Sequence, residues 1–477
     1  MKISCCLLAS ALLAGSVAQG QLIVHEWGTF TSLQDEQGNS IGGINTDDEP
    51  LPEFVHRVAR NILVSPTQAP PAFFQGVPSC HPDVTMRLET PVLYFHVPHD
   101  WKPRAADVHV AFRGGWLTEY WPDAIFRAPG LDGGEPDRVV SNEGHRSAGG
   151  PSSRFGHHTA RTVGELSWKN LTIDAKGEGP ATSEKVWLAP RAVNAAEVKT
   201  SAGECEKFLF YRGVGHVDAP ISVVRNDAKA TLEIRDNIHA LAMINANIKL
   251  RIPAAWIVNV NPDGVCAFRS LGPLEWGKPV RAVTPADFAA KDFQMANLSL
   301  LQGEMRGELV AAGLFPDEAD ALLNTWKISY FKSPGMRLFY ICPRVEVDNL
   351  LPLEISVPSQ TGRVMVGRIE LITPEQRALM KKIAAGPAPD LSAMRGVTAN
   401  GASEFFKHPE NVANWNAVLA GKAPYSVLGL PIPELYRDYL KLGRFRNALI
   451  LEEERRRPTP ALEDFIAKNG FQAYRVD

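Results

Sequence analysis

Two patterns of apolar positions divide the chain. Up to about residue 280, short runs alternate apolar and polar residues, with Gly, Pro and Asp between the runs. Such alternation is typical of strands that bury one face. The clearest runs cover residues 85–97, 107–121, 206–216, 229–237 and 248–268. A series of this kind predicts a sandwich or another layered antiparallel β architecture.

The pattern then changes to a helical period. In "LFPDEADALLNTW", Pro316 lies at an early helical position and acidic residues follow it, and both features are helix start signals. Strand patterns return after residue 335, so we interpret the preceding helices as an insertion or cap on the β-core. A later run has Thr373 as a predicted N-cap and ends at Gly386, and it opens a mainly helical C-terminal region.

We therefore predict an α+β fold with a large antiparallel, sandwich-like β-core, an inserted helical segment and a mainly helical C-terminal region. The predicted boundaries are 1–20 for a signal peptide, 21–283 for the core, 284–335 for the helical insertion, 336–373 for strands that rejoin the core, and 374–477 for the C-terminal region.

The N-terminus predicts export. Lys2 supplies a positive charge, Ile3 to Ala14 form a short apolar run, and Ala18 and Gly20 are the small residues of a cleavage site. We expect cleavage after Gly20 and a periplasmic or extracellular mature protein. After cleavage, no stretch of the sequence is long and apolar enough to predict a transmembrane segment.

Composition and motifs exclude several classes of protein. Charged residues make up 22% of the chain and the formal net charge is −3, which argues against a nucleic-acid binder. The sequence has no GxSxG elbow, no Walker A loop and no dinucleotide-binding fingerprint in a strand–turn–helix context. It therefore carries no recognised catalytic motif.

Four cysteines remain in the mature chain. They are Cys80, Cys205, Cys266 and Cys342. An even number of cysteines in an exported protein predicts two disulfides, with three possible pairings. The alternative is four buried free thiols. The spacing has no CxxC element, so it does not indicate a zinc–thiolate site.

Charged residues occupy apolar strand faces. In "LIVHEWGTFTS", strict alternation places Glu26 with Leu22, Val24 and Phe30. Alternation also places four further charges among apolar residues: Glu89 with Leu93 and Phe95, Arg212 with Phe208 and Phe210, and Arg368 and Glu370 with Val364 and Val366. A buried charge needs a partner, because an isolated one costs several kcal/mol. We predict that Glu26 joins a polar cluster with some of these four residues.

Two interpretations of this cluster stay open. The first is a structural network of ion pairs between strands. The second is a site in which Glu26 and Glu89 divide the acid and base roles of a hydrolase, with Arg212 or Arg368 binding an anionic or sugar group.

Histidines and acids in the first part of the mature chain suggest a divalent metal. The candidate ligands are His25, Asp47, Asp48 and His56, since His, Asp and Glu side chains build zinc and calcium sites. There is no HExxH motif and no EF-hand loop. An acidic run of this kind is more often a solvated loop than a metal site.

Aromatic residues suggest a second kind of ligand. In "GGWLTEYWP", Trp121 and Glu119 follow a strand, and an exposed Trp offers a flat platform for a sugar ring. The alternative is that these aromatics belong to the core.

Several phrases together carry a family resemblance. "HEWGTFTS", "LETPVLYFH", "EKFLFYRGVG", "AGLFPDEADALLNTW" and "GRVMVGRIELITPEQ" occur in this order between residues 25 and 376. Together they resemble a family of exported bacterial proteins of unknown function. The resemblance spans most of the mature chain and implies export and a single extended architecture. It implies no activity, cofactor or catalytic residue.

Two function classes follow from the sequence. One is a non-catalytic envelope or glycan-binding protein, in which the buried charges are structural. The other is an extracytoplasmic hydrolase that acts on polysaccharide or another envelope polymer through Glu26 and Glu89. The absence of a recognised catalytic motif favours the first class.

Overall fold

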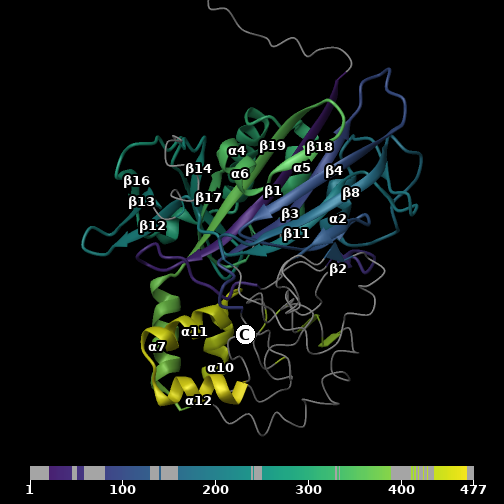
Figure 1. Ribbon diagram of the computed structural model, residues 1–477. Coiled ribbons are helices and arrows are strands. Elements are labelled where there is room, and N and C mark those ends of the chain that lie inside the picture. Colours follow the sequence, from purple (N-terminus) through teal and green to yellow (C-terminus); the bar gives the residue numbers. More distant parts are fainter. Residues whose placement is uncertain are drawn as a thin grey trace, which may run out of the picture.

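The computed structural model describes most of the chain. The described residues are 21–45, 51–57, 81–128, 159–237, 250–327, 330–331, 333–387 and 434–469, with isolated positions between them. They form an α+β fold with one large mixed sheet, a small second sheet and helices that pack on and beside the large sheet (Figure 1). Within these residues, no helix is both long and apolar enough to cross a membrane.

Strand β1 (Leu22–Gln34) lies in the middle of the large sheet. It pairs along its whole length with β19 (Ser359–Leu371) on one side, and from Ile23 to Ser32 with β3 (Met86–His96) on the other. Most pairs in the sheet are antiparallel, as the sequence predicts, but β1 and β19 are parallel. A parallel pair needs a long connection, which the intervening strands and helices supply here.

The other strands extend the sheet on both sides of β1. On the β3 side follow β11 (Leu209–Gly215), β5 (Gly115–Trp121), β8 (Val163–Ile173), β9 (Val198–Lys199) and β10 (Cys205–Glu206), and on the β19 side follow β17 (Gly335–Ile341), β14 (Ala255–Val260) and β15 (Cys266–Ser270). Off this path lie β2 (His56–Arg57), β4 (Arg104–Arg113), β6 (Ile125–Arg127), β7 (Val139–Val140) and β18 (Leu353–Ile355). The small sheet contains β12 (Ile221–Asn226), β13 (Thr231–Asp236) and β16 (Val280–Pro285).

The helices fall into two groups. Those near the sheet are α2 (Lys185–Arg191), η1 (Ala290–Asp292), α4 (Asn297–Ala311), α5 (Pro316–Thr325) and α6 (Arg344–Leu350). The others, α7 (Pro374–Ala385), α10 (Glu434–Lys441), α11 (Arg446–Arg456) and α12 (Pro460–Asn469), gather at one end of the sheet in Figure 1. The predicted cap of α7 is confirmed, since Thr373 Oγ1 accepts a hydrogen bond from the Gln376 amide.

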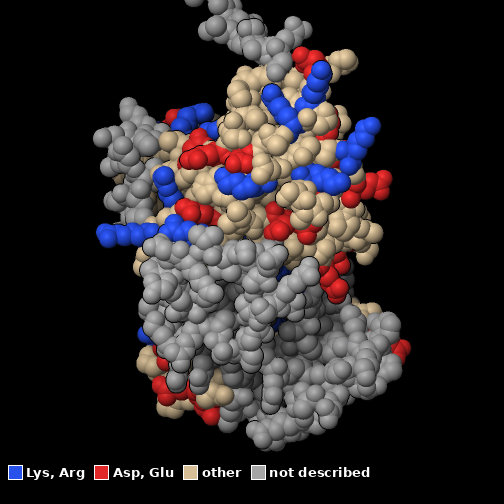
Figure 2. Space-filling model, turned by 45° about the vertical axis from the view of Figure 1, so that its right-hand side comes forward, with Lys and Arg blue, Asp and Glu red and all other residues tan. Residues whose placement is uncertain are grey.

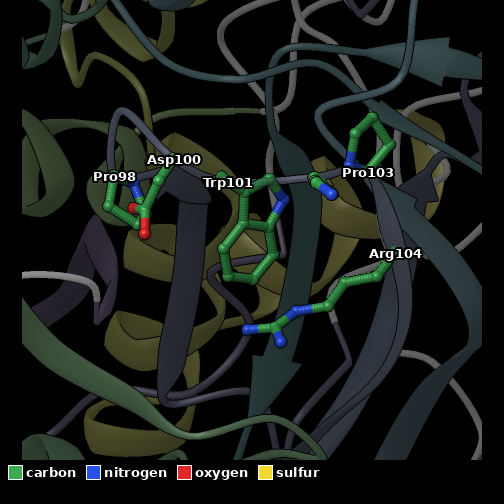
Figure 3. A pocket seen from close by; sticks show the side chains of 6 residues that line it. Pro98, Asp100, Trp101, Pro103 and Arg104 are labelled. Carbon is green, nitrogen blue, oxygen red and sulfur yellow. The ribbon is translucent and has the colours of Figure 1, made fainter.

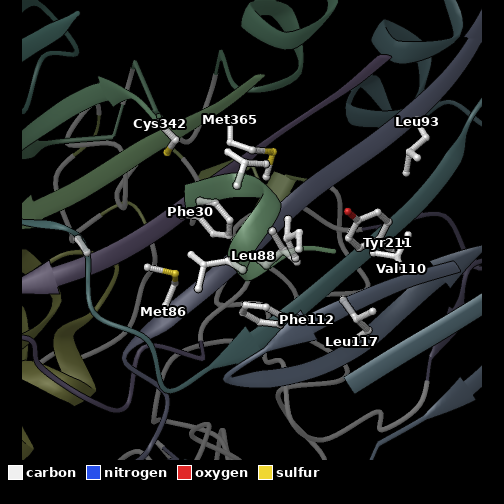
Figure 4. Close-up of a cluster of buried hydrophobic side chains, with 14 of the residues drawn as sticks. Phe30, Met86, Leu88, Leu93, Val110, Phe112, Leu117, Tyr211, Cys342 and Met365 are labelled. Carbon is white, nitrogen blue, oxygen red and sulfur yellow. The ribbon is translucent and has the colours of Figure 1, made fainter. Parts of the chain in front are cut away.

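Each face of the central strands is covered by its own apolar cluster. On the helical face, defined here as the face of β1 that carries His25, Trp27 and Thr31, Trp27 packs in a cluster with residues of α4 and α5. On the opposite face, which carries Val24, Glu26 and Phe30, the cluster joins the large sheet to the small one (Figure 4). Because both faces are buried, any polar side chain on β1 must find a partner.

A bulge in β3 changes which residues share a face. Between Trp27 and Thr29, β1 advances two residues while β3 advances three, and Thr90 in β3 has a φ of 47°. The bulge moves Glu89 to the helical face, whereas Leu93 and Phe95 stay on the opposite face. The prediction that these three residues share a face is therefore wrong.

The bulge also explains why residue 28 is a glycine. A Cβ on Gly28 would lie 2.9 Å from the Cα of Pro91 in the bulge and 2.8 Å from Cε of Met365 on β19. Both distances are shorter than a normal contact, so the backbones of β1 and β3 approach each other here only because residue 28 has no side chain.

One predicted strand ends earlier than expected. The pattern over residues 336–347 predicts a continuous strand, but β17 stops at Ile341 and α6 starts after Pro343. Proline has no amide hydrogen to continue the ladder and fits well at a helix start, which accounts for the change.

Candidate functional site

The candidate functional site is a cluster of two histidines and a glutamate on the helical face. His25 Nδ1 lies 2.7 Å from Oε2 of Glu318, and His96 Nε2 lies 2.9 Å from Oε1 of the same carboxylate. One ligand atom from each residue lies within 4.8 Å of the other two. The cluster therefore places three potential metal ligands around one point.

Three separate elements position these side chains. His25 on β1 is opposite Tyr94 on β3, and His96 lies two residues further along β3 on the same face, so the two imidazoles are diagonal neighbours. Glu318 lies in the first turn of α5, where its Oε2 accepts a 2.7 Å hydrogen bond from the amide of Phe315. The helix cap thus aims the carboxylate at the sheet.

The surroundings of Glu318 favour its charged form. Burial acts to raise the pKa of Glu318, but the hydrogen bonds from His25 and His96 outweigh burial and lower that pKa. The carboxylate is fully buried (0% exposed), so the two imidazoles and the Phe315 amide replace its hydration. A carboxylate of this kind suits either a buried hydrogen-bond network or a metal ligand.

The donor set fits a transition metal. Two imidazole nitrogens and a carboxylate oxygen are ligands of zinc, with bond lengths of about 2.0 to 2.2 Å. Ligand atoms around such an ion are about 3 Å apart. Here each imidazole nitrogen contacts a different oxygen of Glu318, and the three ligand atoms lie within 4.8 Å of one another, so side-chain movements would draw them together around one ion. Calcium and magnesium prefer sites made of oxygen atoms.

The other predicted metal ligands lie elsewhere. His56 Nε2 lies 3.0 Å from Oε1 of Glu204, and its ring stacks on Trp121, so His56 is not part of the cluster around His25. Asp47 and Asp48 are outside the described residues. Of the two candidate ligands that the structure describes, His25 lies in the three-residue cluster and His56 does not.

Glu26 is buried on the opposite face of the sheet. Its carboxylate accepts a hydrogen bond from the Tyr211 hydroxyl, and Oε2 lies 2.5 Å from Nε of Arg363 on the neighbouring strand β19. Arg363 in turn binds Asp348 at 2.9 Å. The partner of Glu26 is thus Arg363, and not Arg212 or Arg368 as predicted.

Glu89 lies in a different network on the helical face. It accepts hydrogen bonds from Thr31 at 2.7 Å and from the Tyr330 hydroxyl at 2.5 Å, and it pairs with Arg87 and Arg444. Burial acts to raise the pKa of Glu89, but the nearby arginines hold that pKa well below its usual range. Because Glu26 and Glu89 are on opposite faces, the structure does not bring them together around one bond.

Arg368 and Glu370 lie in the network around Glu89 rather than beside Glu26. Nε of Arg368 lies 2.6 Å from Oε1 of Glu370, and the guanidinium lies over the ring of Tyr330 at 4.3 Å. Glu370 also pairs with Arg337 at 3.1 Å. Arg444 comes from the turn between α10 and α11, so this network also ties the C-terminal helices to the sheet.

Glu119, Arg212 and Trp121 are buried rather than exposed. Arg212 on β11 pairs with Glu119 on β5 at 3.5 Å, and Arg57 approaches the same carboxylate at 3.4 Å. Trp121 is 4% exposed and packs against Phe54. The prediction of Trp121 as an exposed sugar platform is therefore wrong, and the core interpretation holds.

A different Trp lines a hollow at the surface. Trp101, in the loop between β3 and β4, lines a hollow of about 330 Å³ (Figure 3). The guanidinium of Arg104 lies 3.8 Å from the centroid of the Trp101 ring, and Asp100 and Lys102 complete a polar rim. The volume is at the lower end of the range for small-ligand sites.

The described surface is of mixed charge. In the view of Figure 2, Lys and Arg alternate with Asp and Glu over the described part of the face that is visible. On that face, the charges give no block of a single sign that would attract a highly charged polymer.

Three of the four cysteines are buried free thiols. Cys205, Cys266 and Cys342 are each unpaired, and Cys80 lies outside the described residues. The prediction of two disulfides is therefore wrong for these three cysteines, and the alternative of buried thiols describes them. Burial raises the pKa of Cys342 well above its usual range, which keeps that thiol unreactive.

Glu346 is the most strongly perturbed carboxyl outside these clusters. It lies in the first turn of α6, is fully buried, and its Oε2 has no hydrogen-bond partner in the structure as described. Burial raises the pKa of Glu346 to about 8, although Arg281 acts in the opposite direction. We therefore expect this carboxyl to be mostly protonated at neutral pH.

Comparisons with known proteins identify no family for this chain. No protein-family model matches the chain, and no curated protein matches it. Among solved structures, a similar chain is the Fcho1 Mu homology domain of Danio rerio with bound Eps15 peptide, at 6% identity and a TM-score of 0.25. The match covers 75% of this chain and 97% of that one, but a TM-score this low carries no argument about fold or function.

Alternation along single strands does not indicate that His96 and Glu318 are ligands. Glu318 is 293 residues from His25 along the chain, and nothing local in "FPDEA" indicates which strand its carboxylate faces. His96 could be placed beside His25 only with knowledge of the register between β1 and β3. The sequence did predict the start of the helix at Pro316, which positions Glu318, and it predicted His25 as a candidate ligand.

Proposed function

We propose that the chain is an exported protein that binds one transition-metal ion through His25, His96 and Glu318. The observation that carries this proposal is the convergence of two imidazole nitrogens on one buried carboxylate from three distant parts of the chain. The second imidazole gives the site the ligand count of a zinc centre.

The donor chemistry selects the class of metal. Imidazole and carboxylate suit Zn²⁺, Fe²⁺, Ni²⁺ and Cu²⁺, whereas Ca²⁺ and Mg²⁺ require more oxygen ligands than this cluster offers. The bound ion would connect β1, β3 and α5, and so fasten the helical insertion to the sheet. Metal binding would then stabilise the fold as well as provide a reactive centre.

Export rests on the sequence of the first twenty residues. The charged and apolar segments before Ala18 fit a signal peptide. All of β1 lies after the predicted cleavage point, so cleavage after Gly20 would leave its pairing with β19 and β3 intact. N-terminal sequencing of the secreted or periplasmic protein should begin at Gln21.

The test of metal binding uses the whole mature chain, residues 21–477. The protein is stripped of metal by a chelator and dialysed, and Zn²⁺ is then titrated in by calorimetry. We expect one equivalent of zinc to bind, and His96→Gln to weaken binding by more than about 100-fold, since even outer-shell changes cost 10- to 100-fold. Glutamine keeps a hydrogen-bond donor near Glu318, so the variant should fold.

A matched histidine variant controls for general effects. His109 on β4 is partly buried and contacts Ser167 at 2.8 Å, away from the cluster. His109→Gln should bind zinc like the natural chain. If the natural chain binds no zinc, or if both variants bind it equally well, the proposed centre is wrong and the three residues form a hydrogen-bonded network only.

Glycan binding is a second proposal. Because Trp121 is buried, we place the proposed glycan site at the hollow beside Trp101. The supporting observation is a partly exposed Trp with charged neighbours that can bind sugar hydroxyls. Retention on immobilised envelope polysaccharide should fall in Trp101→Ala and stay unchanged in Trp121→Phe, which alters a buried ring. Equal retention of both variants would remove Trp101 from the proposal.

A hydrolase built on Glu26 and Glu89 is not proposed. Each carboxylate is buried and bound by an arginine and a tyrosine hydroxyl, on a different face of the sheet. Paired carboxylates act on one glycosidic bond from separations of about 5 to 10 Å and from the same cleft. These contacts support the interpretation of the charged residues as a structural network of ion pairs.

A further inference from the structure

We propose that the metal centre keeps one exchangeable position for a small ligand that binds through a single atom, such as water or a small anion. This inference rests on the proposed metal binding and adds the class of ligand. It follows from how Glu318 is held, from the number of ligands and from where solvent reaches the cluster.

The helix cap limits Glu318 to one metal bond. Its Oε2 accepts the 2.7 Å hydrogen bond from the Phe315 amide, which fixes that oxygen at the start of α5. The other oxygen, Oε1, faces Nε2 of His96 at 2.9 Å. Oε2 also lies 2.7 Å from Nδ1 of His25, so each oxygen of Glu318 already faces one imidazole. With one bond from each residue, the cluster would supply three bonds to an ion.

A tetrahedral ion therefore has a fourth position to fill. Zinc sites with three protein ligands bind water or substrate at the fourth, whereas structural sites are closed by four protein ligands. Among the residues that the structure describes, the cluster of mutually close ligand atoms has three members. The fourth bond is thus available to a ligand from solvent.

Solvent reaches the cluster from one side. Glu318 is fully buried and the side chain of His25 is 7% exposed, but that of His96 is 13% exposed and Phe315 is 37% exposed. The ring of Phe315 lies 4.6 Å from that of His25 and 4.7 Å from that of His96. Phe315 therefore packs against both imidazoles on the side that solvent reaches, and we expect its ring to limit the size of a ligand that approaches beside His96.

The step at this position is simple ligand exchange. With an ion held by His25, His96 and Glu318, an incoming anion would replace a water by donating a lone pair, with no oxidation and no change in the protein's covalent bonds. When water is the ligand, the ion makes it more acidic. The centre would then have the Lewis acidity that a hydrolytic site needs.

Cobalt(II) reports directly on this position, because its visible absorption depends on its ligands. The metal-free mature chain is loaded with one equivalent of Co²⁺ and titrated with azide. We expect a saturable change in the absorption bands. In Phe315→Ala, which keeps the backbone amide, imidazole should bind at least about tenfold more tightly than in the natural chain.

The outcomes separate the two proposals. If Co²⁺ binds but neither azide nor imidazole alters its spectrum in either protein, the exchangeable position does not exist and metal binding stands. If imidazole binds equally to both proteins, Phe315 does not limit ligand size, and that part of the inference is wrong. If the natural chain binds no Co²⁺, the metal centre and its open position both fail.

Discussion

Replacing Glu346 by glutamine should stabilise the protein, and the gain should increase with pH. Glu346 is buried in α6 with an unsatisfied carboxyl oxygen, and burial raises its pKa to about 8 from 4.5. Glutamine has nearly the same shape and is neutral at every pH. The change therefore removes one ionisable group and little else.

The sign follows from linkage between protonation and folding. Below pH 4.5 the carboxyl of Glu346 is protonated in both the folded and the unfolded chain, so it carries no penalty. As the pH rises, Glu346 ionises only in the unfolded chain. The free energy of unfolding of the natural chain then falls by about 1.4 kcal/mol per pH unit, until the pH reaches the pKa of Glu346 in the folded state. Between pH 5 and pH 8 the free-energy gap between variant and natural chain should widen by about 4 kcal/mol.

Urea unfolding followed by tryptophan fluorescence can measure this gap. The shift in the urea midpoint, multiplied by a common slope, gives the difference in free energy at each pH. Glu354 on β18 is exposed, so Glu354→Gln is the matched control and should show no such trend. A gap that stays constant from pH 5 to pH 8 would show that Glu346 is ionised in the fold and would refute this reasoning.

Three further variants test other features of the fold. Glu89→Gln should cost about 3 to 5 kcal/mol at pH 7, because it leaves buried arginines without their carboxylate. Since the pKa of Glu89 is lowered, its contribution is lost as the pH falls through that lowered value, so this cost should shrink in acid unfolding experiments. Gly28→Ala should cost about 1 to 3 kcal/mol in urea unfolding, because the methyl group meets Pro91 and Met365, and an unchanged midpoint would mean that the strands separate easily. Thr373→Ala should cost about 1 kcal/mol and fray α7, with Thr373→Ser as the control that keeps the cap and a matching loss of helical circular dichroism as the readout.

Local patterns predicted elements well and long-range partners poorly. Alternation in β1 placed Glu26 and Trp27 on the correct opposite faces, and the α+β class follows from the order of strand and helix patterns. The bulge at Thr90 adds one residue to β3 without any Gly or Asn to indicate it, and this single residue moved Glu89 to the other face. The prediction that Glu26 pairs with Arg212 or Arg368 was also wrong, because its partner is Arg363 on β19.

The site itself depends on contacts that sequence alone does not report. His25, His96 and Glu318 come from the start of one strand, the end of another and the first turn of a helix. Their spacing along the chain matches no short metal motif, because the register of two strands and the docking of α5 bring them together. A pattern search within a single segment cannot find such a site.

The central position of β1 has a consequence for how the chain is made. Its partner β19 is synthesised last among the strands of the large sheet, and the Glu26–Arg363 ion pair joins residues 337 positions apart. The first strand therefore has an unpaired edge until nearly the whole sheet exists, and contacts of such high sequence separation form slowly. We expect a nascent chain that ends before residue 359 to expose this edge and to depend on a chaperone, so that the sheet is completed only after most of the chain has been synthesised.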